Sequence, residues 1–221
     1  MKKRNQKQFL TALCLLAAFV LWTAAICRMD VQPIGPMGSS VGFATLNRLV
    51  HNQTGVHMHL YTVTDWLALV PILFALGFAA AGLVQWLRGK SIRKVDRSIL
   101  ALGGFYALVV TAYLYFEKQV INYRPVLIAG MLEASYPSST TLLVLCVMPT
   151  AAMQLHSRIR NTHLRRIICT AIMAFTAFMV IGRLISGVHW FTDIVGGTLL
   201  SAGLVKLYSA TVNLTQTQMD H

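Results

Sequence analysis

The sequence has 221 residues, of which 56% are hydrophobic and only 12% are charged. This composition is typical of a polytopic membrane protein and argues against a soluble domain. The 19 Lys and Arg residues outnumber the 7 Asp and Glu residues, but they cluster beside the ends of apolar segments, where the positive-inside rule places them. We therefore attribute the basic charge to membrane topology, with anionic lipid headgroups as its counterpart, and exclude nucleic acid as a partner.

Six apolar segments are long enough to cross a bilayer as helices. They cover residues 9–26, 66–86, 99–116, 138–155, 167–185 and 189–208. The first is interpreted as a retained helix, because no clear signal-peptide cleavage pattern follows it. Residues 28–64 are mixed and broken, which indicates an outer loop with one interfacial helix. Pro149 is expected to kink or end the fourth helix.

The basic residues orient these segments. Fourteen of the 19 lie at the N-terminus, in the loops after the second and fourth segments, and near the end of the sixth. This predicts that both termini are cytoplasmic. The predicted fold is all-α, a single membrane domain over residues 1–221 built as a six-transmembrane-helix bundle in a plasma membrane that we take to be bacterial. Lys118, Arg124 and Arg183 lie against helix ends on the outer side, so topology does not explain them.

The clearest chemical pattern joins the last two segments, where Arg183, His189 and Asp193 follow one another within a short stretch. If the sixth helix starts near His189, Asp193 lies one turn later on the same face and can orient the imidazole through a ring N–H. The helix dipole would lower the pKa of His189 and keep its ring neutral. A neutral, oriented imidazole can serve as a nucleophile or a base.

Two further segments reach the same predicted outer face: residues 118–125, with Lys118 and Arg124, and residues 136–141, with Ser138. Cations beside membrane helices are costly unless they bind anions, and the arginine fork suits phosphate oxygens. The second segment opens the fourth helix, whose free backbone N–H groups can hold an anion. The three segments together therefore predict a phosphate site.

These segments resemble the type 2 phosphatidic acid phosphatase superfamily, membrane lipid-phosphate phosphatases related in fold to vanadium haloperoxidases. That family shows Lys-x6-Arg-Pro, Pro-Ser-Gly-His and Ser-Arg-x5-His-x3-Asp, in this order, on the outer ends of a six-helix bundle. The third motif is matched by Arg183, His189 and Asp193, with Gly182 in place of the serine. The resemblance covers roughly residues 60 to 210.

The first two motifs are matched with departures. Arg124-Pro125 fits the first motif, but Lys118 is one residue too close. The second motif keeps Pro137-Ser138 and then reads Ser139-Thr140, where Gly-His is expected. In family members that histidine protonates the leaving alkoxide, and the hydroxyl of Thr140 is far too weak an acid for this task.

The resemblance implies that His189 attacks phosphorus to form a phosphohistidine while Asp193 holds its ring. It also implies a group of phosphate-binding residues, namely Lys118, Arg124, Arg183, Ser138 and Ser139. Neither a metal nor another cofactor is implied. The partners would be the lipid bilayer and a membrane lipid phosphate or diphosphate, and the sequence does not indicate the oligomeric state.

The threonine at position 140 leaves three alternatives. A diphosphate needs no acid, because its leaving phosphate has a second pKa of about 6, and this favours a polyprenyl diphosphate such as undecaprenyl diphosphate. Alternatively, one of the outer-loop histidines, His51, His57 or His59, folds over and donates the proton. The third alternative is a weak or inactive enzyme that binds or carries a lipid phosphate.

A transporter or channel is the competing class of function. The inner halves of the six segments are almost free of ionisable residues, so no relay of polar groups crosses the bilayer. We therefore expect an integral membrane phosphatase that acts on the outer membrane face.

Overall fold

The structure is a computed structural model that describes residues 2–217, with side chains described within residues 5–212. This part of the chain is all-α, with isolated β-bridges and no strand. In chain order the elements are α1 (Lys2–Ile26), the 3-10 turn η1 (Pro36–Gly38), α2 (Ala44–Thr54), α3 (Met58–Leu67), α4 (Leu69–Gly89), the 3-10 turn η2 (Ile92–Lys94), α5 (Arg97–Lys118), α6 (Ser139–Arg158), α7 (Thr162–Ile185) and α8 (Phe191–Thr217). The expected fold class is confirmed.

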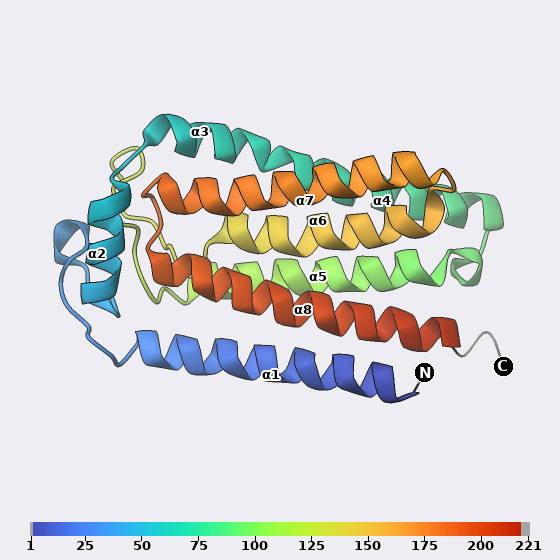
Figure 1. The fold of residues 1–221 in the computed structure, drawn as a ribbon, viewed down its shortest axis with the longest axis horizontal. Helices are drawn as coiled ribbons and strands as arrows, with labels where there is room; N and C mark the ends of the chain where they lie inside the picture. Colours follow the sequence, from blue (N-terminus) through green and yellow to red (C-terminus); the bar gives the residue numbers. More distant parts are fainter. Residues whose placement is uncertain (1, 218–221) are drawn as a thin grey trace.

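Within the described residues, six helical stretches are long and apolar enough to cross a membrane. They are Asn5–Ile26, Met58–Gly89, Arg97–Lys118, Ser139–Arg158, Thr162–Ile185 and Phe191–Val212. Figure 1 shows these helices running along the long axis of the molecule, with α2 lying across one end. The start of α1 and the end of α8 lie together at the other end. We call the end near α2 the site end, and the other the basic end, because it holds the basic loops after α4 and α6.

The second stretch begins earlier than predicted. The sequence places its start at Trp66, whereas the structure starts α3 at Met58 and continues into α4 with Ala68 between them. Thr64 and Asp65 lower the hydropathy of α3, so a hydropathy window excludes this part of the helix. Residues 28–64 are therefore not one loop, since they hold α2 and most of α3.

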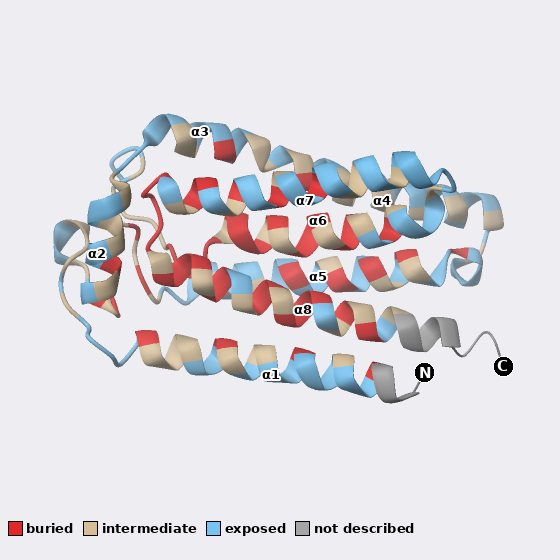
Figure 2. Cartoon of the chain, viewed as in Figure 1, coloured by how far each residue is buried: buried red, intermediate tan, exposed pale blue. Residues whose placement is uncertain are grey.

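The helix α6 continues through Pro149 to Arg158, although the sequence allows it to end at the proline. Together with α8 it is the most buried of the spanning helices. In its most apolar stretch of 18 residues 56% of the residues are buried, against 6% in the corresponding stretch of Met58–Gly89. Figure 2 shows this concentration of buried residues on α6 and α8. Contacts on several sides therefore hold α6 together where proline removes one backbone hydrogen bond.

Two apolar clusters fill the bundle. One joins α1, α5, α6 and α8 around Leu102, Phe105 and Leu142. The other joins α4, α6 and α7 around Val144 and Met148. Because α6 contributes to both clusters, its position is fixed from two sides, and its N-terminal residues are held at the site end.

At the basic end, polar side chains fasten α5, α6 and α8 to one another. Arg158 Nη2 lies 2.7 Å from Asp96 Oδ2. Gln154 Nε2 donates to the hydroxyl of Tyr208 at 2.5 Å, and Ser98 Oγ donates to Gln154 Oε1 at 3.2 Å. Asp96 also caps α5 by accepting a hydrogen bond from Ser98 N at 2.8 Å. These contacts are remote from the site end, so their role is to stabilise the helix bundle.

Candidate active site

The stretch between α7 and α8 carries His189. Gly187 turns the chain with a φ of +69°, and a Cβ atom at this position would lie 1.9 Å from the carbonyl oxygen of Gly55, so only glycine fits. The helix α8 begins at Phe191, two residues after the predicted start at His189. The later start arises because Asp193 Oδ2 accepts a hydrogen bond from Trp190 N at 2.9 Å and so caps the helix at Trp190.

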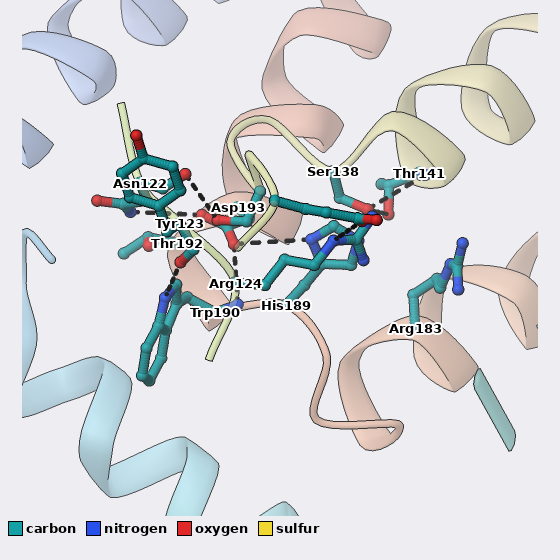
Figure 3. A network of polar contacts seen from close by, with 12 residues as sticks. Asn122, Tyr123, Arg124, Ser138, Thr141, Arg183, His189, Trp190, Thr192 and Asp193 are labelled. Atoms are coloured by element: carbon teal, nitrogen blue, oxygen red, sulfur yellow. Dashed lines mark hydrogen bonds and ion pairs between the residues drawn. The ribbon is translucent and has the colours of Figure 1, made fainter. Parts of the chain in front are cut away.

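His189 is held between a carboxylate and a guanidinium, as Figure 3 shows. Its Nδ1 lies 3.7 Å from Asp193 Oδ2, which is longer than a hydrogen bond, and its Nε2 lies 3.2 Å from Arg124 Nη1. Because a guanidinium can only donate, Nε2 acts as the acceptor and the ring proton is assigned to Nδ1, facing Asp193. Asp193 is held in turn by Asn122, whose Nδ2 donates to Oδ1 at 3.4 Å.

The imidazole of His189 is neutral because it is buried. Its side chain is 1% exposed and that of Asp193 is fully buried. Burial lowers the pKa of His189 to about 4, Asp193 opposes this change, and the charge of Arg124 adds to it. The expected neutral ring therefore has burial as its main cause, rather than the helix dipole. At neutral pH the lone pair of Nε2 is unprotonated and accepts a hydrogen bond from Arg124, and it becomes available to an electrophile when that hydrogen bond is released.

The loop between α5 and α6 delivers Arg124 to the ring of His189. Arg124 N donates to the carbonyl oxygen of Glu133 at 3.0 Å, which pairs the two halves of the loop. Trp190 Nε1 donates to the carbonyl oxygen of Tyr123 at 2.8 Å and ties the loop to the start of α8. Glu133 Oε2 lies 3.0 Å from Arg124 Nε, so the guanidinium has a carboxylate on one side and the imidazole on the other.

Ser138 caps α6, in agreement with the helix opening that the sequence predicts. Its Oγ accepts hydrogen bonds from Thr141 N at 3.4 Å and from Thr141 Oγ1 at 3.0 Å. Ser138 N donates to the carbonyl oxygen of Asp193 at 3.2 Å, so the start of α6 is joined to the start of α8. The side chain of Ser138 serves its own helix, and the first N–H groups of α6 point toward the site end, an arrangement that suits an anion.

Arg183 is buried against α3 and α6. Its Nη2 donates to Asp65 Oδ1 at 2.9 Å and to the hydroxyl of Thr140, and its Nη1 lies 3.5 Å from Thr64 Oγ1. In Figure 3 Arg183 stands apart from the contact between Arg124 and the imidazole. The structure therefore gives the two arginines separate polar partners.

An aromatic ring of α3 lies close to both guanidinium groups. The Cζ atom of Arg183 lies 4.9 Å from the centroid of the Tyr61 ring, and the Cζ atom of Arg124 lies 6.0 Å from it. Cations over the face of an aromatic ring are attracted to it. Tyr61 therefore joins the two arginines across the space between α3, α7 and the loop before α6.

A sequence comparison decides the family. The family model described as PAP2 superfamily matches residues 101–216, more than half of the chain. The chain belongs to the PAP2 superfamily. Among solved structures it is similar to "the first transmembrane PAP2 type phosphatidylglycerolphosphate phosphatase from Bacillus subtilis", with a TM-score of 0.62 and 16% sequence identity. That match covers 91% of this chain and 96% of the other. A comparison with curated proteins gives no match.

Membership in the PAP2 superfamily confirms the resemblance and supports a phosphoric ester hydrolase. The structural match shows that the chain has the fold of a transmembrane PAP2 phosphatase, consistent with a multi-pass membrane protein. All three PAP2 motifs lie at the site end. The network around His189 includes Asp193, Arg124 and Ser138, whereas Arg183 joins the start of α6 through Thr140.

Other predicted site residues lie farther out. Lys118 ends α5 with an exposed side chain, and none of the described contacts links it to the network around the imidazole. His57 and His59 are exposed. His51 is half-buried and packs against Trp190, with ring centroids 5.4 Å apart, and burial lowers its pKa. Figure 3 shows the ring of Trp190 extending away from His189, and no described polar contact joins the ring of His51 to His189 or Arg124.

Two cavities meet at the start of α6. One, of about 540 Å³, lies between α5 and the following loop, and its polar lining includes Glu117, Arg124, Glu133 and Ser139. The other, of about 460 Å³, is an apolar groove between α4, α5 and α6, lined mainly by Ile72, Val109, Val110, Leu114, Leu142 and Leu143, with Ser139 and Thr140 at one end. Among the described residues, no group of three His, Cys, Asp or Glu side chains is placed to hold a metal ion.

Sequence reasoning missed the residues of α3 that reach the site. Tyr61 and Thr64 lie in the region interpreted as an outer loop, and Asp65 lies between this region and the predicted membrane helix that starts at residue 66. The available signal was Asp65, an acidic residue at the edge of an apolar segment. Thr64 also accounts for Gly182, because a Cβ atom at position 182 would lie 2.9 Å from Thr64 Cγ2. The close approach of α3 to α7 therefore favours glycine where the PAP2 motif has serine.

Proposed function

We propose that the protein removes the terminal phosphate from a lipid diphosphate on the outer membrane face, with His189 as the nucleophile. The observation that carries this proposal is the neutral, buried imidazole, whose Nε2 meets Arg124 while its Nδ1 faces Asp193. Attack of Nε2 on phosphorus would form a phosphohistidine and make the ring cationic, and the carboxylate of Asp193 would stabilise that charge.

The phosphate would bind between the two arginines. Arg124 Nη1 already touches the nucleophilic atom, so a phosphate bound to this guanidinium has its phosphorus next to Nε2. Arg183 and the first N–H groups of α6, at Ser139 and Thr140, would hold the remaining oxygens and stabilise charge in the transition state. Lys118 would add positive charge from the rim.

A diphosphate is favoured over a phosphate monoester. The hydroxyl of Thr140 cannot protonate an alkoxide, and the half-buried His51 of α2 packs against Trp190 without a described polar contact to His189 or Arg124. A leaving phosphate with a second pKa of about 6 needs no proton at neutral pH. The apolar groove that ends at Ser139 and Thr140 suits a long hydrocarbon chain, which supports a polyprenyl diphosphate such as undecaprenyl diphosphate.

The distribution of basic residues supports the orientation. The loops after α4 and α6 and the helix ends that adjoin them lie at the basic end. They carry nine Lys and Arg residues, namely Arg88, Lys90, Arg93, Lys94, Arg97, Arg158, Arg160, Arg165 and Arg166. By the positive-inside rule this end faces the cytoplasm. The site end would then face outward, in the plasma membrane of a bacterium.

Phosphate release by the detergent-purified protein tests this function. The substrates are undecaprenyl diphosphate, phosphatidate and phosphatidylglycerophosphate, and the matched variant is His189→Ala. We expect release from the diphosphate, at least tenfold slower release from the two monoesters, and loss of release in the variant. Equal rates on all three substrates would refute the preference for a diphosphate. Activity in the His189→Ala protein would refute the assignment of His189 as the nucleophile.

A second candidate is a lipid-phosphate-binding or carrier protein with little turnover. The observation that favours it is the engagement of both arginines: Glu133 pairs with Arg124, and Asp65 pairs with Arg183. A phosphate must displace or share these carboxylates before it can bind. Saturable binding of the same lipids without phosphate release would select this candidate.

A further inference from the structure

One nitrogen atom joins a carboxylate to the start of α6. Arg183 Nη2 donates both to Asp65 Oδ1 and to the hydroxyl of Thr140, so these two acceptors lie around the same atom. The side chain of Arg183 is 2% exposed, whereas that of Asp65 is 57% exposed. Asp65 therefore combines a fixed position beside the start of α6 with access to water.

This position lies on the side of the site that faces the nucleophilic atom. Nδ1 of His189 faces Asp193, and Nε2 points the other way, to Arg124. In Figure 3 Arg183 lies on the side of His189 opposite Asp193. Entering and leaving groups at phosphorus are roughly in line. Water that attacks a phosphoryl group on Nε2 therefore approaches from the side of the ring away from Asp193, and Figure 3 places Arg183 on this same side.

The second half of the proposed reaction needs a proton acceptor for that water. Asp193 is fully buried and already accepts a hydrogen bond from Trp190 N. Glu133 is bound to Nε of Arg124, whereas Nη1 of the same guanidinium meets His189. The guanidinium therefore separates Glu133 from Nε2. The hydroxyl of Thr140 is too weak a base, and no described contact joins Glu117 to either arginine of the site. Asp65 is therefore the best-placed acceptor in the described part of the site.

We propose that Asp65 is the general base that activates water for hydrolysis of the phosphohistidine at His189, an inference that rests on the proposed function. The water oxygen bonds to phosphorus, the bond from phosphorus to Nε2 breaks, and its electron pair returns to the imidazole. The water proton moves to the carboxylate of Asp65 and from there to solvent. One water is consumed, and inorganic phosphate and the free histidine are formed.

The role of α3 follows from this assignment. Tyr61 and Asp65 are four residues apart in α3 and so lie on the same face of the helix. Tyr61 packs against both guanidinium groups, and Asp65 binds Arg183. The helix α3 thus supplies the proposed general base, Asp65, which lies outside the three PAP2 motifs.

The test traps the intermediate. A short-chain polyprenyl diphosphate, radiolabelled in its terminal phosphate, is mixed with the wild-type protein and with Asp65→Asn, Asp65→Ala, Asp65→Glu, Glu133→Gln and His189→Ala. Reactions are quenched in alkali, where phosphohistidine is stable. We expect Asp65→Asn and Asp65→Ala to release one equivalent of polyprenyl phosphate rapidly, to retain labelled protein, and to turn over 10²- to 10⁴-fold more slowly than the wild type.

The remaining variants separate the possible outcomes. Asp65→Glu keeps a carboxylate and should retain part of the turnover, formate should partly rescue Asp65→Ala, and Glu133→Gln should not accumulate label. Slow turnover of Asp65→Asn and Asp65→Ala without labelled protein would overturn the assignment, because Asp65 would then only position Arg183 for the first step. Unchanged turnover in both variants would also overturn it. An inactive wild type, or an active His189→Ala protein, would instead refute the proposed function itself.

Discussion

The protonation of His189 gives the sharpest test of the site. Burial lowers its pKa from 6.5 to about 4. At 1.36 kcal/mol for each pH unit, protonating this ring is about 3 kcal/mol harder than protonating an exposed histidine. At pH 5.5 a ring with a pKa of about 4 is almost wholly neutral, whereas one with a pKa of 6.5 is only about one tenth neutral. The site should therefore keep its neutral nucleophile at pH 5.5.

Nitrogen NMR of the protein labelled in histidine measures this directly. The His189→Ala variant identifies the signals of the ring, and a titration from pH 8 to pH 4 follows them. We expect the tautomer with the proton on Nδ1 down to about pH 5, and protonation only near pH 4. The unfolded chain takes up this proton first as the pH falls, so stability should decrease between pH 6.5 and pH 4 by up to about 3 kcal/mol. Protonation of His189 near pH 6.5, or a proton on Nε2 at neutral pH, would refute the burial argument.

Three substitutions test other parts of the site. Thr140→His should raise the rate of phosphate release from monoesters at least tenfold relative to release from the diphosphate, because it supplies an acid for an alkoxide leaving group. An unchanged monoester rate would contradict this expectation. His51→Ala should leave turnover within about twofold, since the His51 ring packs against Trp190 and has no described polar contact with His189 or Arg124. A hundredfold loss would instead identify His51 as the acid. Gly182→Ala should lower the free energy of unfolding by about 1–3 kcal/mol, measured by thermal unfolding. In a Thr64→Ser background, which lacks the clashing Cγ2, the same substitution should have little effect. Equal losses of stability in both backgrounds would disprove the contact.

Much of the bundle could be predicted from the sequence because hydropathy and charge act over whole helices. The six apolar segments correspond to the six candidate spans. Boundaries were less predictable where local contacts decide them. The helix α8 starts at Phe191 because Asp193 caps it at Trp190, and α6 continues through Pro149 because it is buried on several sides. Neither effect can be inferred from the periodicity of the sequence.

The motif residues could be found because residues of each motif lie close together in the sequence, so their spacing indicates which side chains share a helix end. The proximity of Arg124 to His189 could be anticipated from two helix ends on one membrane face. The contribution of α3 could not, since Asp65 and Arg183 are 118 positions apart and no local pattern links them. The side chains that neutralise or support the motif residues come from elsewhere in the chain, and the sequence alone does not pair them.

The start of α8 draws on distant parts of the chain, and this affects how such a site can diversify. Asn47 and Thr192 pair twice, with Asn47 Nδ2 3.0 Å from the Thr192 hydroxyl and Thr192 N 3.2 Å from Asn47 Oδ1. Trp22 Nε1 donates to the carbonyl oxygen of Thr192 at 3.2 Å. These supports, like Asp65, precede residue 101, where the family match begins. The C-terminal half thus encodes the motif residues, while the N-terminal half supplies their supports and the proposed base. Substitutions in the first hundred residues can therefore retune the chemistry of the site without changing a single motif position.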